Sequence, residues 1–422
     1  MKIARATIFL ASAAFATLLI KHSVTSVAPG MDAPETFTMP AEFEPQGAVW
    51  IGARPTENGR PAIPIVVKMV QALAPHLEIY LMVPDSRVKA EVQTVLRHMD
   101  VDAKRVHFWT SESSPTRWYR DVGAIFLKSN RGRLKVVDFD FNCYGECPTG
   151  STEAKQKEGI DRQTAGLLHL PVMRTRLVSE GGDREVNGRG TLMVVEAVEM
   201  QRNPRLTRNQ IERELLRVLG QKKTIWLKRG VAEDDKAEGG PIYGNVYGVG
   251  TGGHIDEMAR FTAPDTVVLE EVTAKERDSN SVFRKSYERL EENYRILNAS
   301  TDQDGHKFRI VRMPAADPIY LNLTFKPGDH GLGYFRGSKP GQPIRVILPA
   351  SYMNFFISNG VVLAPAYWKL GRPEMTRRKD QVAKQILQRL FPNRTIVQID
   401  AENLNYGGGG LHCATQQQPA TP

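Results

Sequence analysis

The sequence predicts a single α/β domain over residues 36–419, on two grounds. Short apolar strands alternate with amphipathic helices from Phe37 to about Gln418, and no long low-complexity linker interrupts them. The strand candidates alternate in polarity and are rich in β-branched and aromatic residues, which is typical of half-buried strands. The composition, 41% hydrophobic and 24% charged, is that of an ordinary globular protein.

The strand candidates follow one another along the whole chain. LEIYLMV and TVVLEEV are examples in which apolar and β-branched residues dominate a short run. The predicted strands cover residues 48–52, 77–83, 124–128, 135–141, 191–197, 266–272 and 361–367.

Three segments have the pattern and the end signals of amphipathic helices. In the first, LTRNQIERELLRVLG, Thr207 and Gln210 have the spacing of a capping box, and Gly220 ends the periodic pattern. The second, RPEMTRRKDQVAKQILQRLFP, has a proline near its start and another just past its end. The third is SRVKAEVQTVLRHMD. Residues 273–310 and 324–345 are polar and glycine-rich, so we expect long surface excursions there, and no sequence repeat is apparent.

The first 28 residues have the order of a secretory signal. Two basic residues precede an apolar run over residues 6–20, which the small residues Ser26 and Ala28 follow. This run is shorter than the roughly 20 residues that a spanning helix needs. We therefore expect a secreted or periplasmic protein with no stable membrane insertion after cleavage of the leader; a retained N-terminal anchor is the alternative.

The formal net charge of +9 does not by itself indicate a nucleic-acid partner. Proteins that bind nucleic acids gather their basic residues on one face or in a run. Here Lys and Arg are interspersed with Glu and Asp along the helices, as in RNQIERELLR. We therefore expect a solvated basic surface and no nucleic-acid binding.

The three cysteines divide into a close pair and a single thiol. Cys143 and Cys147 lie close together in FNCYGECP, which favours a local disulfide in an exported chain. A metal site there would need further ligands at suitable spacing, and none lies nearby. Cys413 is left over behind the glycines of GGGGLHCATQQQP, where a flexible backbone lets a ligand approach closely. The alternative for Cys413 is a buried, inert thiol.

Polar residues interrupt the strand pattern at three further places. Asp121 precedes a strand, Glu180 precedes a glycine pair, and His254 and Asp256 follow one. Loops beside strand ends are where a scaffold presents its chemistry. Because residues two apart in an extended segment point to the same side, we expect His254 and Asp256 to face one cavity. Each has a plain alternative: a surface ion pair for Asp121, and a structural role for the His-x-Asp pair.

A thiol, an imidazole and at least two carboxylates together suit the chemistry of a guanidinium group. Carboxylates match its planar fork of N–H donors. Its central carbon is a poor electrophile, so attack needs a thiolate, which a protonated histidine or a bound cation favours. A histidine can also move the protons of the leaving amine and of water. Trp118 could stack on the cation, its alternative being a core tryptophan.

The motifs resemble those of the agmatine deiminase and bacterial-type peptidylarginine deiminase family, members of the guanidino-group-modifying superfamily. The likeness runs from about Phe37 to Gln418, and the motifs follow one another in the order of the family. They are MPAEFEPQGAVWIG, WYRD, FNCYGE, EGGD, MQRNPRLTRNQIE, GGHIDEMARF, SYMNFFISNGVVLAPAYW and GGGGLHCATQQQP.

This resemblance implies a five-bladed α/β propeller with pseudo-fivefold symmetry and an active site at its axis. It implies that Cys413 is the nucleophile, that His254 is the acid/base, and that Asp121 and Asp256 bind the guanidinium. Residues 36–419 would then be one deiminase catalytic domain.

The resemblance also implies supporting roles around the pocket. Glu180 and Asn354 match further motif positions, as residues of the pocket or of its surroundings, and the glycines that end at Gly410 wrap around the substrate. Neither a metal nor an organic cofactor is expected, and a homo-oligomer is left open.

The predicted substrate is agmatine or a related small guanidine, which would give a ureido product and ammonia. The alternative is peptidyl or free arginine, which would give citrulline. Arg54-Pro55 stands where the agmatine branch usually has Trp-Pro, and Gln46-Gly47 where it favours His-Glu. Cys143-Tyr144-Gly145 is closer to the agmatine branch than to the Arg-x-Arg pair of the secreted peptidylarginine deiminase. An exported, inactive guanidine-binding protein and an amidinotransferase are further alternatives.

Overall fold

Five sheets of one design make up most of the described part of the chain. The structure, a computed structural model, describes residues 34–110 and 117–422, and residues 36–422 form one compact unit. In each of the five sheets, a central strand has an antiparallel neighbour on one side and a parallel neighbour on the other. With the central strand second, they are β22 (Thr415–Pro419), β2 (Gln46–Gly52) and β5 (Glu78–Val83); β7 (Ile125–Ser129), β8 (Leu134–Asp140) and β9 (Val172–Val178); β10 (Glu185–Val186), β11 (Thr191–Val195) and β12 (Lys223–Leu227); β14 (Ala259–Ala263), β15 (Thr266–Glu271) and β16 (Arg309–Pro314); and β19 (Phe356–Ile357), β20 (Val361–Ala366) and β21 (Thr395–Asp400).

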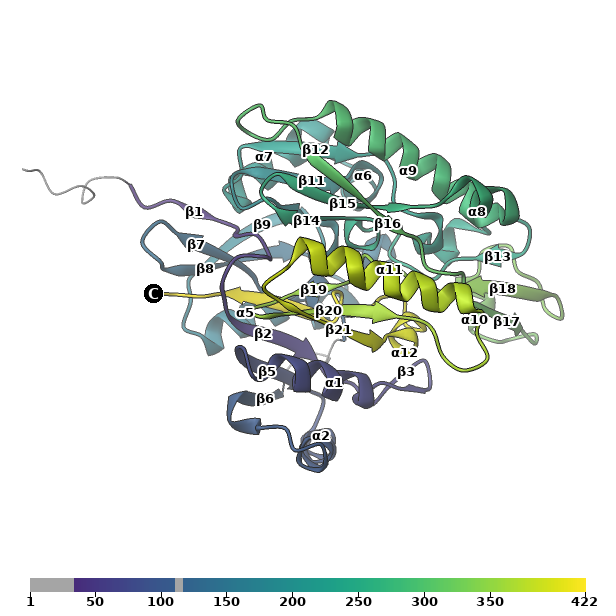
Figure 1. Ribbon diagram of the computed structural model, residues 1–422, viewed down its shortest axis with the longest axis horizontal. Helices are drawn as coiled ribbons and strands as arrows, with labels where there is room; N and C mark the ends of the chain where they lie inside the picture. Colours follow the sequence, from purple (N-terminus) through teal and green to yellow (C-terminus); the bar gives the residue numbers. More distant parts are fainter. Residues whose placement is uncertain (1–33, 111–116) are drawn as a thin grey trace, which may run out of the picture. The chain divides into compact units, whose positions relative to one another are not determined.

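Helices connect the two parallel strands of each of these sheets. Parallel strands cannot be joined by a tight hairpin, and a helical crossover is the usual solution. The crossover helices are α1 (Ile63–Leu73), α4 (Thr152–Glu158) with α5 (Ile160–Leu167), α6 (Glu196–Arg202) with α7 (Arg208–Leu219), α8 (Ala274–Ser279) with α9 (Ser281–Ala299), and α11 (Glu374–Leu390). Figure 1 shows α9 and α11 lying along the strands of their own sheets. The core fills the space between helix and sheet; Val66 and Val70 of α1, for example, belong to one buried cluster with Val49 and Ile79.

The remaining strands extend two of these sheets or form two separate small ones, and four further helices lie in the connections. They are β1 (Phe37–Thr38) beside β7; β6 (Val106–Thr110) beside β5; the hairpin β3 (Thr56–Glu57) and β4 (Arg60–Pro61); the small sheet of β13 (Val246–Tyr247), β18 (Pro343–Ile347) and β17 (Tyr320–Thr324); and the helices α2 (Ser86–His98), α3 (Tyr119–Val122), α10 (Gly331–Tyr334) and α12 (Glu402–Asn405).

The predicted strands and helices are confirmed, with ends that differ by a few residues. All seven strand candidates correspond to β2, β5, β7, β8, β11, β15 and β20, and the three helices correspond to α2, α7 and α11. The capping box of Thr207 and Gln210 is present at the start of α7. Gly220 ends this helix with φ of 64°, in the left-handed region that glycine adopts most readily.

The expectation of a surface excursion over residues 273–310 is wrong. This segment contains α8 and the 19-residue α9, which Asn280 caps at its start: the Asn280 side chain accepts hydrogen bonds from the backbone N–H groups of Val282 and Phe283. One side of α9 is buried, including Phe283, Leu290 and Leu297. Residues 324–345 are largely exposed, as expected, and contain the one-turn helix α10.

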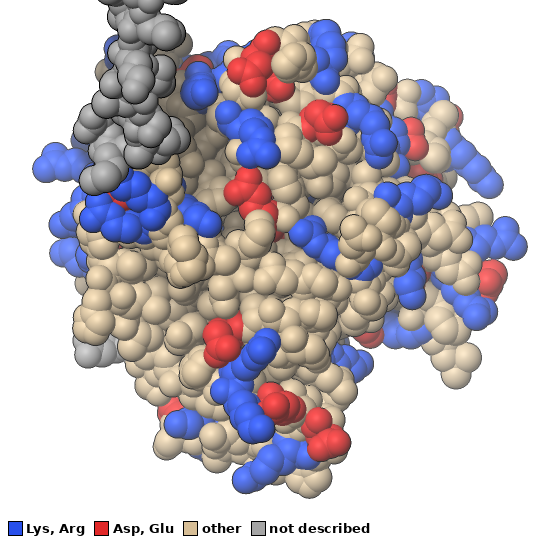
Figure 2. All heavy atoms as spheres, turned by 60° about the vertical axis from the view of Figure 1, so that its left-hand side comes forward, with Lys and Arg blue, Asp and Glu red and all other residues tan. Residues whose placement is uncertain are grey.

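Two expectations stay predictions. The leader, residues 1–28, lies outside the described residues. Among the residues that are described, every helix is too short or too polar to cross a membrane. Basic and acidic side chains are interspersed on the face that Figure 2 shows. The absence of a nucleic-acid partner is not tested by this observation.

Candidate active site

The nucleophile candidate lies in the glycine-rich loop between α12 and β22. Cys413 is 2% exposed and lies at the wall of a cavity of about 270 Å³. At Gly409, a Cβ atom would come within 3.1 Å of the Cys413 sulfur and 2.9 Å of the Trp118 ring. The backbone can therefore pass between the thiol and the indole only because this residue has no side chain.

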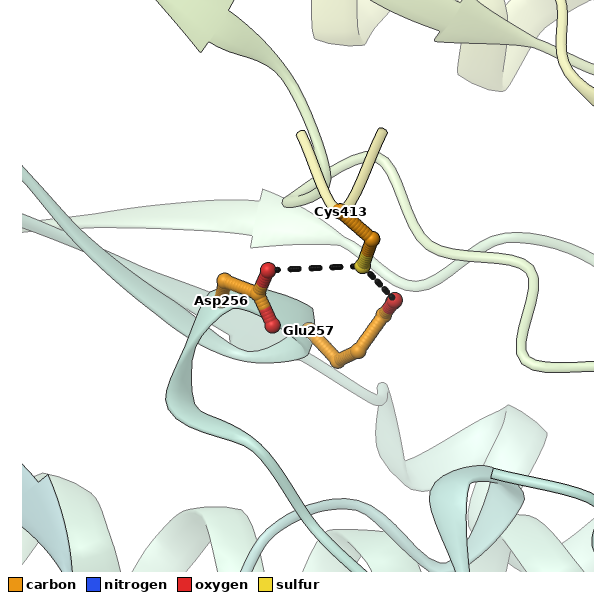
Figure 3. Close-up of side chains that lie close together, drawn as sticks. All are labelled: Asp256, Glu257 and Cys413. Carbon is orange, nitrogen blue, oxygen red and sulfur yellow. Dashed lines mark hydrogen bonds between the residues drawn. The ribbon is translucent and has the colours of Figure 1, made fainter. Parts of the chain in front are cut away.

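Three polar side chains surround the thiol, two of them drawn with it in Figure 3. Cys413 Sγ lies 3.5 Å from Asp256 Oδ2 and 3.8 Å from Glu257 Oε1. Asn354 Nδ2 lies 3.0 Å from the same sulfur and donates to Glu257 Oε1 at 2.8 Å. The Asn354 amide oxygen in turn accepts from the backbone N–H of His412 at 2.8 Å. Asn354 thus fixes the loop and one carboxyl group relative to the thiol.

His254, Asp121 and Asp256 meet around Gly182. A Cβ atom at Gly182 would lie 2.5 Å from His254 Nδ1, 2.8 Å from Asp121 Oδ1 and 3.3 Å from Asp256 Oδ2. The Gly182 N–H donates to Asp121 Oδ1 at 3.0 Å. The prediction that the chain is extended at His254 is wrong, because residues 255–257 form a 3₁₀ turn. The two side chains nevertheless converge on one point.

Glu180 holds the imidazole of His254 from the side away from Gly182. Its Oε2 lies 3.3 Å from His254 Nε2, and both of its oxygens accept from Arg202 Nε. Burial alone would lower the pKa of His254, but the charges of Asp121 and Glu180 outweigh it and raise this pKa to about 10. The imidazole is therefore a cation in the ligand-free protein at neutral pH.

The other ionisable groups of the site differ in protonation. Burial raises the pKa of Asp121 to about 6, although the charge of His254 opposes the shift. Burial also favours a protonated Asp256, but a hydrogen bond from His412 outweighs it and lowers the pKa of that carboxyl group. Burial, with the charge of Asp256, raises the pKa of Glu257 well above its usual range. Burial and the same charge raise the pKa of Cys413, so the sulfur is a thiol at rest.

Some buried polar atoms of this cluster have no hydrogen-bond partner among the described residues. They are His254 Nδ1, Asp256 Oδ1 and Glu257 Oε2. Buried polar groups are nearly always hydrogen-bonded, so unpaired ones call for an explanation. A ligand with several N–H donors placed beside Cys413 would supply partners for the carboxylate oxygens.

The predicted site residues do not all reach the cavity. Trp118, Asp121 and Cys413 line it, whereas His254 and Asp256 are buried beside it. Glu180, Asn354 and Gly410 are also buried and are absent from its lining. The roles assigned to these residues stay predictions. In the structure, a disulfide joins Cys143 to Cys147, with Cα atoms 5.4 Å apart.

Sequence reasoning missed a series of buried, hydrogen-bonded side chains behind the thiol, which links Asp256, His412 and Glu42. His412 Nδ1 lies 2.7 Å from Asp256 Oδ2, and His412 Nε2 lies 2.8 Å from Glu42 Oε2. Glu257 was missed as well. The signal that could have found His412 and Glu257 is that each directly adjoins a chosen residue, Cys413 and Asp256, whereas Glu42 is far away in the sequence.

Among the described residues, two groups of side chains have donor atoms close enough to hold a metal ion. Asp256, Glu257 and Cys413 each offer one atom, and these atoms lie within 4.8 Å of one another. A thiolate with carboxylates is a ligand set that zinc accepts. Asp302, Asp304 and His306 form the second group. The expectation that no metal is needed stays a prediction.

Comparisons with known proteins define the class of this α/β fold. One similar solved structure is that of an agmatine deiminase from Enterococcus faecalis, an enzyme that the structure's description presents as catalysing its reaction. It is 27% identical to this chain with a TM-score of 0.70, and the match covers 91% of this chain and 96% of the other. Agmatine deiminases from Medicago truncatula and Pseudomonas syringae pv. tomato are 30% and 31% identical, each over 91% of this chain and 96% of the relative. The model of the Porphyromonas-type peptidyl-arginine deiminase family matches residues 38–419. The chain belongs to this deiminase family.

Proposed function

We propose that the protein is a guanidine deiminase, a hydrolase of C–N bonds in linear amidines. It hydrolyses agmatine or a related small guanidine to a ureido product and ammonia. The observation that carries this proposal is the unpartnered buried atom Asp256 Oδ1, which belongs to a carboxylate whose other oxygen lies 3.5 Å from the Cys413 sulfur. The agmatine deiminases at 30% and 31% identity over nearly the whole chain support the choice of substrate.

The resting charges suit a mechanism in which the substrate activates the thiol. Burial and the charge of Asp256 raise the pKa of Cys413, and a bound guanidinium would neutralise the charge of Asp256. The pKa of the thiol then falls and its proton leaves to solvent. Asp121 and Asp256 hold the planar cation, with its central carbon facing the thiolate.

The first half of the reaction forms a covalent intermediate. The Cys413 thiolate adds to the guanidinium carbon and gives a neutral tetrahedral adduct. The His254 imidazolium donates its proton to one amino group, and the bond from carbon to that nitrogen breaks. Ammonia leaves, a cationic S-alkylthiouronium remains on Cys413, and the imidazole is neutral.

The second half returns the enzyme to its starting form. Neutral His254 removes a proton from water as the oxygen adds to the thiouronium carbon. The bond between carbon and sulfur breaks, so that Cys413 leaves as a thiolate, which takes back from solvent the proton that the thiol lost at the start once the product has left. The ureido product loses its remaining proton, which the ammonia takes up as ammonium, and His254 is again an imidazolium.

We also propose the finer architecture that the resemblance implies, a five-bladed α/β propeller with pseudo-fivefold symmetry. The five sheets with the same strand order and crossover support it. Each would be one blade. The loops that carry Asp121, Glu180, His254, Asn354 and Cys413 each come from a different part of the chain, as expected for a site at the axis.

Export is a further part of the proposal. The order of charges and apolar residues in the first 28 positions supports a secretory signal. The bonded pair Cys143 and Cys147 is compatible with an oxidising compartment. We therefore place the mature enzyme outside the cytoplasm, in the periplasm or the medium.

A second substrate, peptidyl or free arginine, is favoured by Arg54. This exposed residue lines the cavity that holds Cys413, and its guanidinium has no ion-pair partner within residues 34–110 and 117–422. A cation in the cavity lining suits the α-carboxylate of free arginine or of a C-terminal arginine, which agmatine lacks. Larger cavities of about 790 and 770 Å³ share Tyr334 with this one and would accommodate a peptide.

The test is release of ammonia and of the ureido product by the purified protein, with Cys413→Ala as the control. Agmatine, free arginine, and peptides with internal or C-terminal arginine are compared at equal concentration. Turnover of agmatine above the others supports the first proposal, and turnover of arginine or a peptide supports the second. If the wild-type protein, with Cys413 as a free thiol and the Cys143–Cys147 disulfide intact, turns over none of them but binds them, the protein is a guanidine-binding protein instead.

A further inference from the structure

The loop closed by the Cys143–Cys147 disulfide has an unusual backbone. Three successive residues have positive φ: Cys143 at 53°, Tyr144 at 59° and Gly145 at 87°. Residues with side chains rarely adopt this left-handed region, and two in a row persist only where the surroundings hold them. The loop follows β8 and precedes α4.

Several contacts hold this loop in place. Besides the disulfide, the Asn142 side-chain oxygen accepts from the Gly145 N–H at 2.8 Å. Lys236 Nζ donates to the backbone carbonyl of Tyr144 at 2.8 Å. A Cβ atom on Gly145 would overlap the side-chain amide of Gln201, so the loop is also packed from outside.

The loop presents Tyr144 to the predicted active site. The phenol O–H donates to Asp121 Oδ2 at 3.1 Å, while Asp121 Oδ1 accepts from the Gly182 N–H at 3.0 Å. Both oxygens of this carboxylate are thereby fixed. Tyr144 lines the same cavity as Cys413, and its ring lies 6.1 Å from that of His254.

We propose that Tyr144 positions Asp121 for guanidinium binding, and that the Cys143–Cys147 disulfide holds Tyr144 in place, so that full activity requires the disulfide. This inference rests on the deiminase function proposed above. Burial, together with the charges of Asp121 and Glu180, raises the pKa of Tyr144 well above its usual range, so the phenol keeps its proton and remains a donor. Tyr144 acts through Asp121 and takes no part in bond making.

The phenol also affects the protonation of Asp121. The groups around this carboxylate are the imidazolium of His254, the carboxylates of Glu180 and Asp256, the thiol of Cys413, the guanidinium of Arg184 and the phenol itself. A donated hydrogen bond favours the ionised form of a carboxyl group. Without the phenol, Asp121 is protonated at a higher pH, and the acid limb of kcat/KM moves upward.

The first test compares Tyr144→Phe with Tyr243→Phe, a change at a tyrosine that is 63% exposed and absent from the lining of the Cys413 cavity. A hydrogen bond to a charged group predicts a loss of about tenfold to a hundredfold in kcat/KM for Tyr144→Phe. The acid limb of the pH profile also shifts upward, and Tyr243→Phe matches the wild type. An unchanged rate and pH profile in a folded Tyr144→Phe protein would overturn the role of Tyr144.

The second test asks whether the disulfide acts through Tyr144. We expect the double variant Cys143→Ser/Cys147→Ser to lose activity, by no more than Tyr144→Phe does. A variant with all three changes should then lose no more of its kcat/KM than Tyr144→Phe alone, because the same contact is lost only once. Losses that multiply, or a fully active double variant, would overturn the role of the disulfide.

A third measurement replaces the second test if circular dichroism shows that the double variant does not fold. A phosphine reductant is added to the wild type and to Tyr144→Phe, and free thiols are counted. Reduction should slow the wild type and leave the residual rate of Tyr144→Phe unchanged; equal slowing of both contradicts the proposal. A wild type that turns over no guanidine at all refutes the deiminase function itself, which is a different result from a wild type that is active and insensitive to these changes.

Discussion

The carboxylate of Glu42 is the hub of the buried charges behind the active site, and replacing it with glutamine is a sharp test of their importance. Oε1 accepts from Arg260 Nη2 at 2.9 Å and from the Ile357 N–H at 2.8 Å. Oε2 accepts from Arg120 Nη2 at 2.9 Å and lies 2.8 Å from His412 Nε2. Glu42 is 7% exposed, so water cannot replace these contacts.

The cost of Glu42→Gln follows from these contacts. Glutamine keeps one acceptor oxygen, and its amide N–H groups would face the donors of the arginines or of the histidine. Removing one partner of a buried ion pair costs about 3–5 kcal/mol. A unit of about 390 residues unfolds with an entropy of about 0.8 kcal/mol/K, so a loss of about 4 kcal/mol lowers Tm by about 5 °C.

The assay is thermal and urea unfolding followed by circular dichroism, with Glu44→Gln as the matched control. Glu44 lies two residues away, and its nearest charged partner is the exposed Arg189 at 3.8 Å. Such a surface pair contributes at most about 1 kcal/mol. If Glu42→Gln were no more destabilising than Glu44→Gln, the assignment of Glu42 as the hub would be refuted.

Further predictions concern pH and the site. Burial raises the pKa of Glu42, but Arg260, His412 and Arg120 outweigh it and hold this pKa well below its ordinary value. Glu42 therefore stabilises the fold fully above its ordinary pKa of about 4.5, and the free energy of unfolding falls as the pH drops below that value. Gly182→Ala should reduce kcat/KM by at least a hundredfold, because its Cβ atom would lie 2.5 Å from His254 Nδ1; kinetics on the folded variant checks this. Since the pKa of Asp121 is about 6, kcat/KM for agmatine should fall as the pH drops through that region. Because its pKa is raised, the Cys413 thiol should react with iodoacetamide more slowly at pH 7 than a free cysteine does, as mass spectrometry can show.

Each of these predictions has an outcome that contradicts it. Acid unfolding of Glu42→Gln should be less steep than that of the wild type; identical pH dependence argues against the shifted pKa. Gly188→Ala is the control for Gly182→Ala, since it places a methyl group away from the site, and equal losses would mean a general effect on folding. A kcat/KM that does not change between pH 5 and 8 would contradict the prediction for Asp121. Rapid alkylation of Cys413 by iodoacetamide at pH 7 would contradict the prediction for the thiol.

The sequence could predict the strands because they are short apolar runs, but it could not reveal the repeated sheets. Their common feature is the order and direction of strands, which many different residues can satisfy. The helix α9 was missed because polar residues occupy buried positions of its apolar side. Ser286 donates to Glu233, and Asn293 bonds to the backbone at Lys228 and Arg229.

The sequence could predict those residues of the candidate site whose side chains are reactive or charged and which also stand beside glycines or a strand end. Cys413, His254, Asp256 and Asp121 each stand beside glycines or a strand end. The structure places Cys413 and Asp121 at the wall of one cavity, with His254 and Asp256 buried beside it. The contact between Glu42 and His412 joins residues 370 positions apart. No local pattern carries such information, so this part of the site required the folded chain.

The place of β22 in the first sheet has a consequence for the timing of activity during synthesis. β22 pairs with β2, near the other end of the described chain, and Cys413 lies just before it. A ribosome therefore makes the predicted nucleophile and this closing strand only after every other strand of the five sheets. A nascent chain that still lacks this segment has four of its five sheets complete in sequence, yet it has neither Cys413, the thiol that we propose attacks a guanidine, nor a partner for one side of β2.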